Sequence, residues 1–491
     1  MIDHSRVARL GAGAAKLTEE EVLAHLDANL IHISAEAGLA GGMLTLRVLV
    51  TTLRRMPGRL NLDPRGLDQR LVDDLVRLVR DIDSAKPLEI GDAVPAGAVH
   101  IHVGLEARAP GAIRVIPDGY GMHVARDAAV TIVQARPAHP LGSVLAAAFA
   151  AAEAFKDAAP VVDDRCHRHD HLTWCAVSLS HDLTAAPMHD GPLVLDVALA
   201  GCGAVGTAVA LILSELDASG DVLVLDRQDL GPENIATYSL GGEEDGRLRR
   251  RKVDLVAEAL GRKYNVTRRH GDLATLAADV DNGRVRCPPL FLTGLDSVTA
   301  RHEVQRLWPE RLIDAGTGDT AVGLHYAVAG SGPCLMCFLP PGGHRSAVEL
   351  RAERTGLSVE LLGRGDDVLL EEDLAELDPE QRELLLPHVG KKICNLANAP
   401  GLIERAGDFQ AAVTFVALQA ACLAVGRLVA AELKLEMYNF IQYDSLIGPR
   451  ADAAERRKRN SECYCQTKAE RIRKVREERM APAAEGGSSG R

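Results

Sequence analysis

Three closely spaced glycines stand between an apolar strand and an apolar helix. Val197–Ile212 reads VALAGCGAVGTAVALI, in which Gly201, Gly203 and Gly206 form GxGxxG. Such a turn lets a phosphate approach backbone N–H groups at a helix N-terminus, where the helix dipole favours negative charge. Asp226 ends the next expected strand, about 20 residues after Gly206, where it can bind a ribose hydroxyl. The pattern predicts a nucleotide site and leaves open whether the nucleotide is a redox dinucleotide or ATP.

A run of cations after the glycine turn bears on that choice. Asn234 stands in DRQDLGPENIATYSL, and the following segment carries Arg247, Arg249, Arg250, Arg251 and Lys252. Cleavage of the α–β bond of ATP builds negative charge on the leaving pyrophosphate, which nearby cations neutralise. A dehydrogenase has no such requirement, so the run favours ATP.

A second acid ends another apolar strand. The segment PPLFLTGLD places Asp296 at the strand's carboxyl end, with Arg301 one helical turn later. A carboxylate in this place beside a triphosphate is a natural Mg²⁺ ligand. Alternatively, Asp296 caps the helix that starts at Ser297.

Two cysteine pairs have spacings that suit a structural metal. Cys334 and Cys337 form CxxC, and Cys463 and Cys465 form CxC. Four thiolates form a closed tetrahedral Zn²⁺ site, which would fasten the C-terminal region to the sheet. The alternative is four reduced surface thiols.

Cys394 stands apart from these pairs, beside Lys391 and Lys392. Neighbouring cations lower a thiol pKa and favour the nucleophilic thiolate, although a buried packing cysteine also fits this apolar context. Apolar surroundings predict core positions for Cys202, Cys287 and Cys422. A metal site or a plain polar linker would explain one more cluster, Cys166, His167, His169, His171 and Cys175.

The elements that must position these residues occur twice. Asn29–Asp63 and Leu195–Asp226 each read as a strand, a small-residue turn, a helix and a strand ending in an acid. Each half closes with a helix of small residues, in Leu141–Lys156 and Ala411–Lys434. This repeat predicts two related α/β units, each built on a parallel sheet. The first unit has lost the glycine pattern, since its turn reads EAGLAGG, and we expect it to be a structural partner.

Together these residues resemble the adenylating enzymes that activate ubiquitin-like proteins, which include the ThiF-type sulfur-carrier adenylyltransferases and the ubiquitin-activating enzymes. The resemblance spans roughly Leu193–Cys465. It implies that Asp226 holds the ATP ribose, that Asn234 and Lys252 contact the phosphates, and that Asp296 binds Mg²⁺.

The chain departs from that family at one position. The family usually has an arginine shortly after the asparagine, where this chain has Thr237. Arg247–Arg251 could supply the missing charge, so Arg251 joins the expected ATP site. The family also borrows an arginine from the N-terminal segment of a partner unit, and Arg6 and Arg9 are the candidates here.

The predicted fold class is α/β, with two tandem Rossmann-like adenylation-type units and a helical, cysteine-bearing insertion. The first unit is expected to be degenerate and the second active. The predicted boundaries are an inactive unit at 1–160, a linker at 161–192, the active unit at 193–341 and 401–465 with a zinc-binding end, a catalytic-cysteine insertion at 342–400, and a basic, partly disordered tail at 466–491.

The resemblance also implies a function. The chain would adenylate the C-terminal glycine of a ubiquitin-like protein with Mg-ATP, form a thioester at Cys394 and hand it to a conjugating enzyme, in a bacterial antiviral system. One alternative is adenylation of a sulfur-carrier protein without a thioester. Others are an NAD-dependent oxidoreductase and a nucleotide-sensing scaffold without catalysis.

Composition limits the partners. The 491 residues suggest two or three domains, and the net charge of −12 argues against a polyanion partner. Aromatic residues make up 3%, too few for a base-stacking platform, so we expect no nucleic acid. Without a signal sequence or an apolar run of about 18 residues, we expect a cytoplasmic protein with no membrane span. The sequence leaves open whether the chain forms a homodimer.

Overall fold

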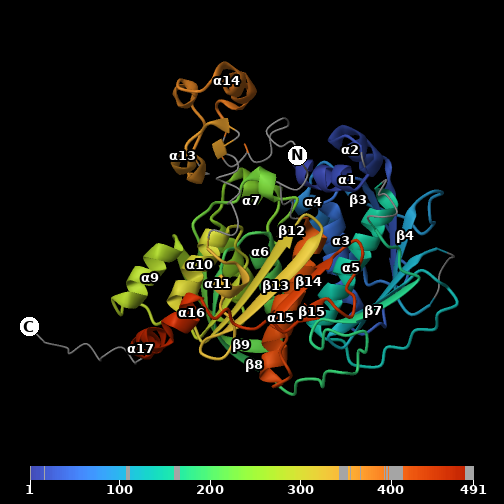
Figure 1. The fold of residues 1–491 in the computed structure, drawn as a ribbon. Helices are drawn as coiled ribbons and strands as arrows, with labels where there is room; N and C mark the ends of the chain where they lie inside the picture. Colours follow the sequence, from blue (N-terminus) through green and yellow to red (C-terminus); the bar gives the residue numbers. More distant parts are fainter. Residues whose placement is uncertain are drawn as a thin grey trace, which may run out of the picture.

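The computed structural model describes the following residues: 2–15, 17–106, 111–159, 166–341, 352–353, 355–364, 367–391, 393, 396 and 413–480. Two β-sheets organise this part of the chain, with helices packed between them (Figure 1).

The first sheet has seven strands in the order β3-β2-β1-β4-β5-β6-β7. The strands from β3 to β5 are parallel, whereas β6 and β7 pair antiparallel. Their bounds are β1 Leu30–Ala35, β2 Arg59–Leu62, β3 Leu88–Ile90, β4 Val99–Val103, β5 Ile113–Asp118, β6 Gly121–Ala125 and β7 His171–Cys175. The segment 161–192, predicted as a linker, therefore contains a strand of the first sheet, because HLTWC alternates toward the core and solvent.

The second sheet repeats this topology and adds one edge strand. Its order is β10-β9-β8-β11-β12-β13-β14-β15, parallel from β10 to β12 and antiparallel beyond. The bounds are β8 Leu193–Ala200, β9 Ala218–Asp226, β10 Asn265–His270, β11 Leu290–Thr293, β12 Arg311–Gly318, β13 Ala321–Val328, β14 Phe440–Asp444 and β15 Ala454–Glu455. The shared strand order confirms the predicted pair of related α/β units.

Four helices form the layer between the sheets: α3 Gly42–Arg54, α5 Pro140–Ala158, α6 Ala204–Glu215 and α15 Thr414–Glu432. A small residue lets α15 approach the turn after β7 closely at Gly426, where a Cβ would lie 2.3 Å from the Ala176 carbonyl oxygen. Among the described residues, α15 has the length and apolar composition to cross a membrane, but it is almost entirely buried in this core.

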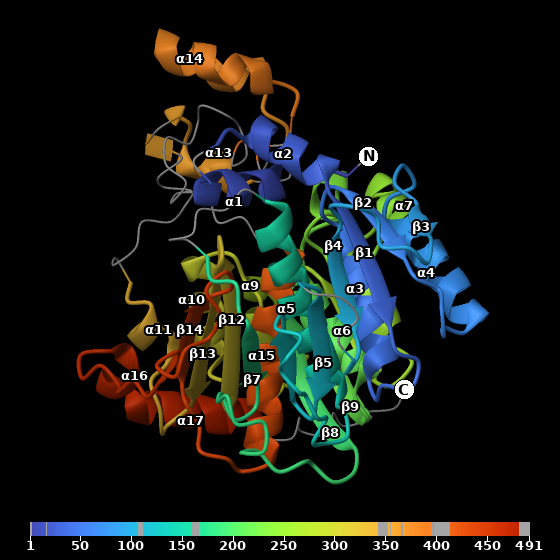
Figure 2. The same cartoon turned by 90° about the vertical axis from the view of Figure 1, so that its right-hand side faces the viewer.

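The remaining helices cover the sheet faces and build the insertion. Both views place α13 and α14 of the insertion at the end of the molecule that carries α1 and α2 (Figure 2). The insertion has a small hydrophobic core of its own, which includes Leu362, Leu374 and Leu385. Bounds are α1 Ser5–Ala15, α2 Glu19–Ala28, α4 Gln69–Ile82, α7 Glu243–Arg247, α8 Lys252–Leu260, α9 Leu273–Asp281, α10 Val298–Leu307, α11 Leu335–Phe338, α13 Val359–Gly363, α14 Pro379–Leu385, α16 Tyr464–Thr467 and α17 Ala469–Met480.

Candidate active site

The glycine turn joins β8 to α6 and is packed too tightly for other residues at two of its three glycines. Gly201 has φ +90°, and its N–H donates to the Leu225 carbonyl at 2.9 Å. At Gly206 a Cβ would lie 1.9 Å from the Gly201 carbonyl oxygen. At Gly203, the N-cap of α6, the atom nearest to an added Cβ would be the Gly294 carbonyl oxygen, 4.0 Å away. Open space therefore remains at the helix N-terminus, where an anion is favoured.

Asp226 ties the glycine turn to the end of β9. Its carboxylate accepts the Cys202 N–H at 2.7 Å and the Gln228 N–H at 2.8 Å. Each carboxylate oxygen has a second lone pair, so the group can also accept a ribose hydroxyl. The residue is partly buried beside the turn, in the place that its spacing predicts.

Lys252 places a buried cation near Asp226. The residue is 4% exposed, and Nζ donates to Oε1 of Gln228 at 2.7 Å and lies 5.2 Å from the centre of the Tyr238 ring. Burial lowers the pKa of the ammonium, but Tyr238 and Asp226 outweigh that effect, so the pKa is raised and the charge is kept. Sequence reasoning missed Gln228 and Tyr238, although Gln228 stands only two residues after Asp226.

Asn234 lies in a short 3-10 turn, Pro232–Asn234. Its Oδ1 accepts the Gly231 N–H at 3.0 Å, which leaves the amide NH₂ for a ligand. Thr237 is fully buried, and its hydroxyl donates to the Asn234 carbonyl at 3.0 Å. Thr237 thus holds the turn together and brings no charge to the site.

The arginine run contributes less charge than its sequence suggests. Arg247 forms an ion pair with Glu244, and Arg250 forms ion pairs with Asp245 and Glu258. Arg251 is exposed at the start of α8 and has no ion pair with any described residue. Of these three, Arg251 is free to meet a phosphate.

The loop that carries Asn234 rests on the first unit. Arg55, at the end of α3, is buried and donates to the carbonyl oxygens of Ile235 at 2.6 Å and Gly241 at 2.8 Å. Burial lowers the pKa of Arg55 to about 9, which still leaves it cationic at pH 7. Gly242 lies so close to α4 that a Cβ would be 2.0 Å from the Asp81 carbonyl oxygen.

Arg6, in α1, brings a second cation to this region. Its charge acts on the pKa values of both Lys252 and Tyr238, which places the guanidinium near them. Its Nε is buried without a hydrogen bond to any described residue. The side chain of Arg9 lies outside the described residues.

Asp296 follows β11 and is exposed, without a hydrogen bond or ion pair to any described residue. Ser297 caps α10, since its side chain accepts the Ala300 N–H at 3.1 Å, so the alternative of Asp296 as the cap is wrong. Arg301 donates to the Leu295 carbonyl at 2.9 Å and lies 3.4 Å from the buried Asp314 carboxylate. Arg301 fixes this loop and leaves Asp296 available for a cation.

In the first unit, the positions that match Gly201 and Asp226 carry side chains that bind to the chain itself. Glu36 stands after β1 where Gly201 stands after β8, and its carboxylate accepts two backbone N–H groups of the loop after β4, each at 2.9 Å. Asp63 stands where Asp226 does, and Nη2 of Arg65 donates to it at 2.6 Å. The side chains at these two positions of the first unit are thus engaged with the chain itself.

The two cysteine pairs meet, as predicted. Sγ of Cys334 lies 3.8 Å from that of Cys337 and 3.5 Å from that of Cys463, and Sγ of Cys337 lies 3.5 Å from that of Cys465. A tetrahedral Zn²⁺ with Zn–S bonds of about 2.3 Å requires sulfurs about 3.8 Å apart, so the cluster can hold zinc.

The three cysteines predicted as core positions are buried, and Cys394 is not among the residues that the structure describes. Cys202, Cys287 and Cys422 are buried as predicted, and burial raises the pKa of Cys287 to about 11. Cys394 lies outside the described residues. Within the described part of the chain, the four-cysteine cluster is the one group of three or more potential ligands at metal-binding distance, so the metal hypothesis for the 166–175 segment has no support.

No protein-family model matches the chain, and no curated protein matches it. Among solved structures, E. coli MccB with succinimide is 14% identical over 55% of this chain and 65% of that chain, with a TM-score of 0.34. The microcin C7 biosynthetic enzyme MccB with N-formylated MccA is 16% identical over 55% and 67%, also at 0.34. PaaA is 20% identical over 27% and 40%, at 0.22. The chain spans 65% of the length of the first of these.

Proposed function

We propose that the chain is an ATP-dependent adenylating enzyme. The observation that carries this proposal is the buried ammonium of Lys252, whose hydrogen-bond partner Gln228 is neutral and which forms no ion pair with a carboxylate in the described part of the chain. Tyr238 and Asp226 keep this ammonium charged, and its three N–H donors suit a further anionic partner such as a triphosphate. The orphaned Nε of Arg6 near Lys252 supports the same conclusion, because a triphosphate would satisfy both groups.

The proposed reaction needs no protein nucleophile in its first step. A substrate carboxylate, already ionised at pH 7, attacks the α-phosphorus of ATP. The new bond joins the carboxylate oxygen to the α-phosphorus, and the bond from that phosphorus to the oxygen bridging it to the β-phosphate breaks. Pyrophosphate leaves with the electron pair, and an acyl-adenylate remains. Catalysis is then positioning and charge neutralisation.

Each site residue has a role in this scheme. Asp226 would hold the ribose, and Asn234, through its amide NH₂, would bind a phosphate oxygen. Lys252, Arg251 and Arg6 would neutralise the charge that develops on the pyrophosphate. Asp296 would bind Mg²⁺, which supplies further charge neutralisation when bound. Carboxylates are suitable ligands for this ion, and Asp296 has none of its lone pairs engaged by a described residue.

For the substrate, we propose the C-terminal glycine of a ubiquitin-like protein. This step rests on the resemblance in sequence, as do the bacterial antiviral setting and the conjugating enzyme. In a second step, the Cys394 thiolate would attack the acyl carbon, form a thioester and release AMP. Adenylation of a sulfur-carrier protein without a thioester is the second candidate, in which Cys394 is a packing residue.

The products test this proposal. With ATP and the ubiquitin-like protein, the chain should release pyrophosphate, and AMP should appear as the acyl group moves to a thiol. Release of ADP and phosphate would contradict it. On a non-reducing gel, wild type should show a thiol-sensitive adduct that Cys394→Ala loses. Pyrophosphate release without an adduct would favour the sulfur-carrier alternative.

A further inference from the structure

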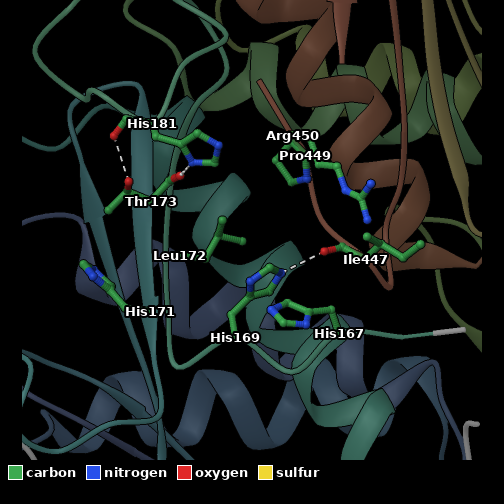
Figure 3. Close-up of a pocket in the computed structure, with 9 residues that line it drawn as sticks. All are labelled: His167, His169, His171, Leu172, Thr173, His181, Ile447, Pro449 and Arg450. Atoms are coloured by element: carbon green, nitrogen blue, oxygen red, sulfur yellow. Dashed lines mark hydrogen bonds between the residues drawn. The ribbon is translucent and has the colours of Figure 1, made fainter. Parts of the chain in front are cut away.

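A pocket of about 400 Å³ lies where the two units meet, and it shares no residue with the glycine turn (Figure 3). One wall is the segment before and along β7, and the other is the turn after β14, with Ile447, Pro449 and Arg450. The walls are joined by backbone, since the His167 N–H donates to the Leu446 carbonyl at 2.9 Å. A volume of this size accommodates a small molecule.

The lining of this pocket is rich in nitrogen, and no carboxylate is among the described residues that line it. Four histidines contribute, and Arg450 adds a permanent positive charge. Arg450 is exposed and has no ion pair with any described residue. An exposed arginine beside several imidazoles suits the bidentate recognition of an oxyanion.

Two of the histidines are fixed by backbone carbonyls. Nε2 of His169 donates to the Ile447 carbonyl at 2.9 Å, and Nδ1 of His181 donates to the Thr173 carbonyl at 2.7 Å. Figure 3 shows the His181 ring, which belongs to the segment after β7, on the side of the pocket near Pro449. One nitrogen of each of these two rings is thereby occupied, and the second nitrogen is left for a ligand.

We propose that this pocket binds the oxyanion group, phosphate or carboxylate, of a small molecule, with Arg450 as the fixed charge and histidine ring nitrogens as further hydrogen-bond partners. His181 lines the pocket together with His167, His169, His171 and Arg450. On its own turn lies Asp182, whose carboxylate accepts from Thr184. Arg136 donates to the Thr184 carbonyl at 2.7 Å.

Calorimetric titration of the full-length chain tests the proposal. Inorganic phosphate and succinate serve as probes at one fixed pH near neutrality, in wild type and in Lys252→Met, which removes a proposed phosphate contact of the nucleotide site. We expect saturable binding of at least one probe, equal in the two proteins. Binding of phosphate alone would identify a phosphate ligand, and binding of succinate alone a carboxylate ligand. Binding that disappears in Lys252→Met would overturn the proposal.

Surface variants complete the test. Arg450→Gln should weaken binding about tenfold or more, because a charge-assisted hydrogen bond is lost. The matched control Arg262→Gln removes an exposed, unpaired arginine elsewhere and should bind like wild type. His181→Gln should also weaken binding, because a ring nitrogen of the lining is removed. Absence of saturable binding in wild type, or unchanged binding in Arg450→Gln, would show that the pocket is not an anion site.

Discussion

Replacing Gly203 with alanine separates ligand binding from packing in the glycine turn. Gly203 has φ −78°, which alanine adopts without strain, and the nearest atom to its Cβ would be 4.0 Å away. The matched control is Gly206→Ala, whose Cβ would lie 1.9 Å from a backbone oxygen. The two variants add the same methyl group, one to open space at the helix N-terminus and one to packed backbone.

We expect Gly203→Ala to change mainly the affinity for ATP and Gly206→Ala to change mainly the free energy of unfolding. Gly203→Ala should change the free energy of unfolding by less than about 1 kcal/mol, because alanine mainly restricts the unfolded chain. Its methyl group would stand between the helix N-terminus and a bound phosphate and remove a charge-assisted hydrogen bond, which weakens ATP binding about tenfold to a hundredfold. Gly206→Ala should cost about 1–3 kcal/mol from overpacking, even after its gain in helix propensity.

Thermal unfolding and calorimetric titration with ATP measure both effects. Gly203→Ala should unfold like wild type and bind ATP poorly, whereas Gly206→Ala should melt several degrees lower, since about 1 kcal/mol shifts the melting temperature by roughly 2–4 °C in a large domain. Wild-type ATP affinity in a well-folded Gly203→Ala protein would refute the view that this turn holds phosphate.

Four further predictions follow from the structure. Lys252→Met should fold but lower the rate of adenylate formation by about 10²–10³, as loss of a transition-state donor does, measured as pyrophosphate release; an unchanged rate would exclude the proposed role. Cys337→Ser should lose bound zinc and melt roughly 5 °C lower or more, checked by metal analysis and calorimetry; full stability without metal would contradict a structural site. Arg55→Met should cost about 3 kcal/mol or more, since two buried carbonyls lose a charged donor, and should weaken ATP binding, with partial rescue by Arg55→Lys; intact ATP binding would separate Arg55 from the site. Burial lowers the pKa of His139 to about 4, and its Nδ1 accepts the Leu141 N–H, so its contribution to stability should be present above pH 6.5 and fall as the pH drops toward 4, whereas His139→Asn should flatten that part of the stability profile.

Local spacing predicted the core of the candidate site. The strand–turn–helix pattern placed Gly201 and Gly206 where only glycine fits, and the distance to Asp226 placed that carboxylate against the turn. CxxC and CxC brought four sulfurs together, because a tetrahedral site needs little beyond correctly spaced ligands. The repeated order of elements predicted two sheets of the same topology.

Contacts between the units could not be predicted in the same way. Arg55 reaches Ile235 across 180 positions in sequence, and no periodicity encodes such a contact. Neutralisation of Arg247 and Arg250 depends on acids that face them only after folding. Within the predicted linker, the strand β7 was missed, since its five residues lie in a polar, histidine-rich segment that obscures the alternation.

ATP–pyrophosphate exchange tests the central claim most directly, because it reports reversible cleavage of the α–β bond. The chain should catalyse exchange when a ubiquitin-like protein with an intact C-terminal glycine is present. Exchange should be lost when that glycine is deleted, and it should fall by about 10²–10³ when Lys252 is replaced by methionine. Tight binding of NADH, with no ATP binding and no exchange in the presence of a verified partner, would contradict adenylation and favour an oxidoreductase.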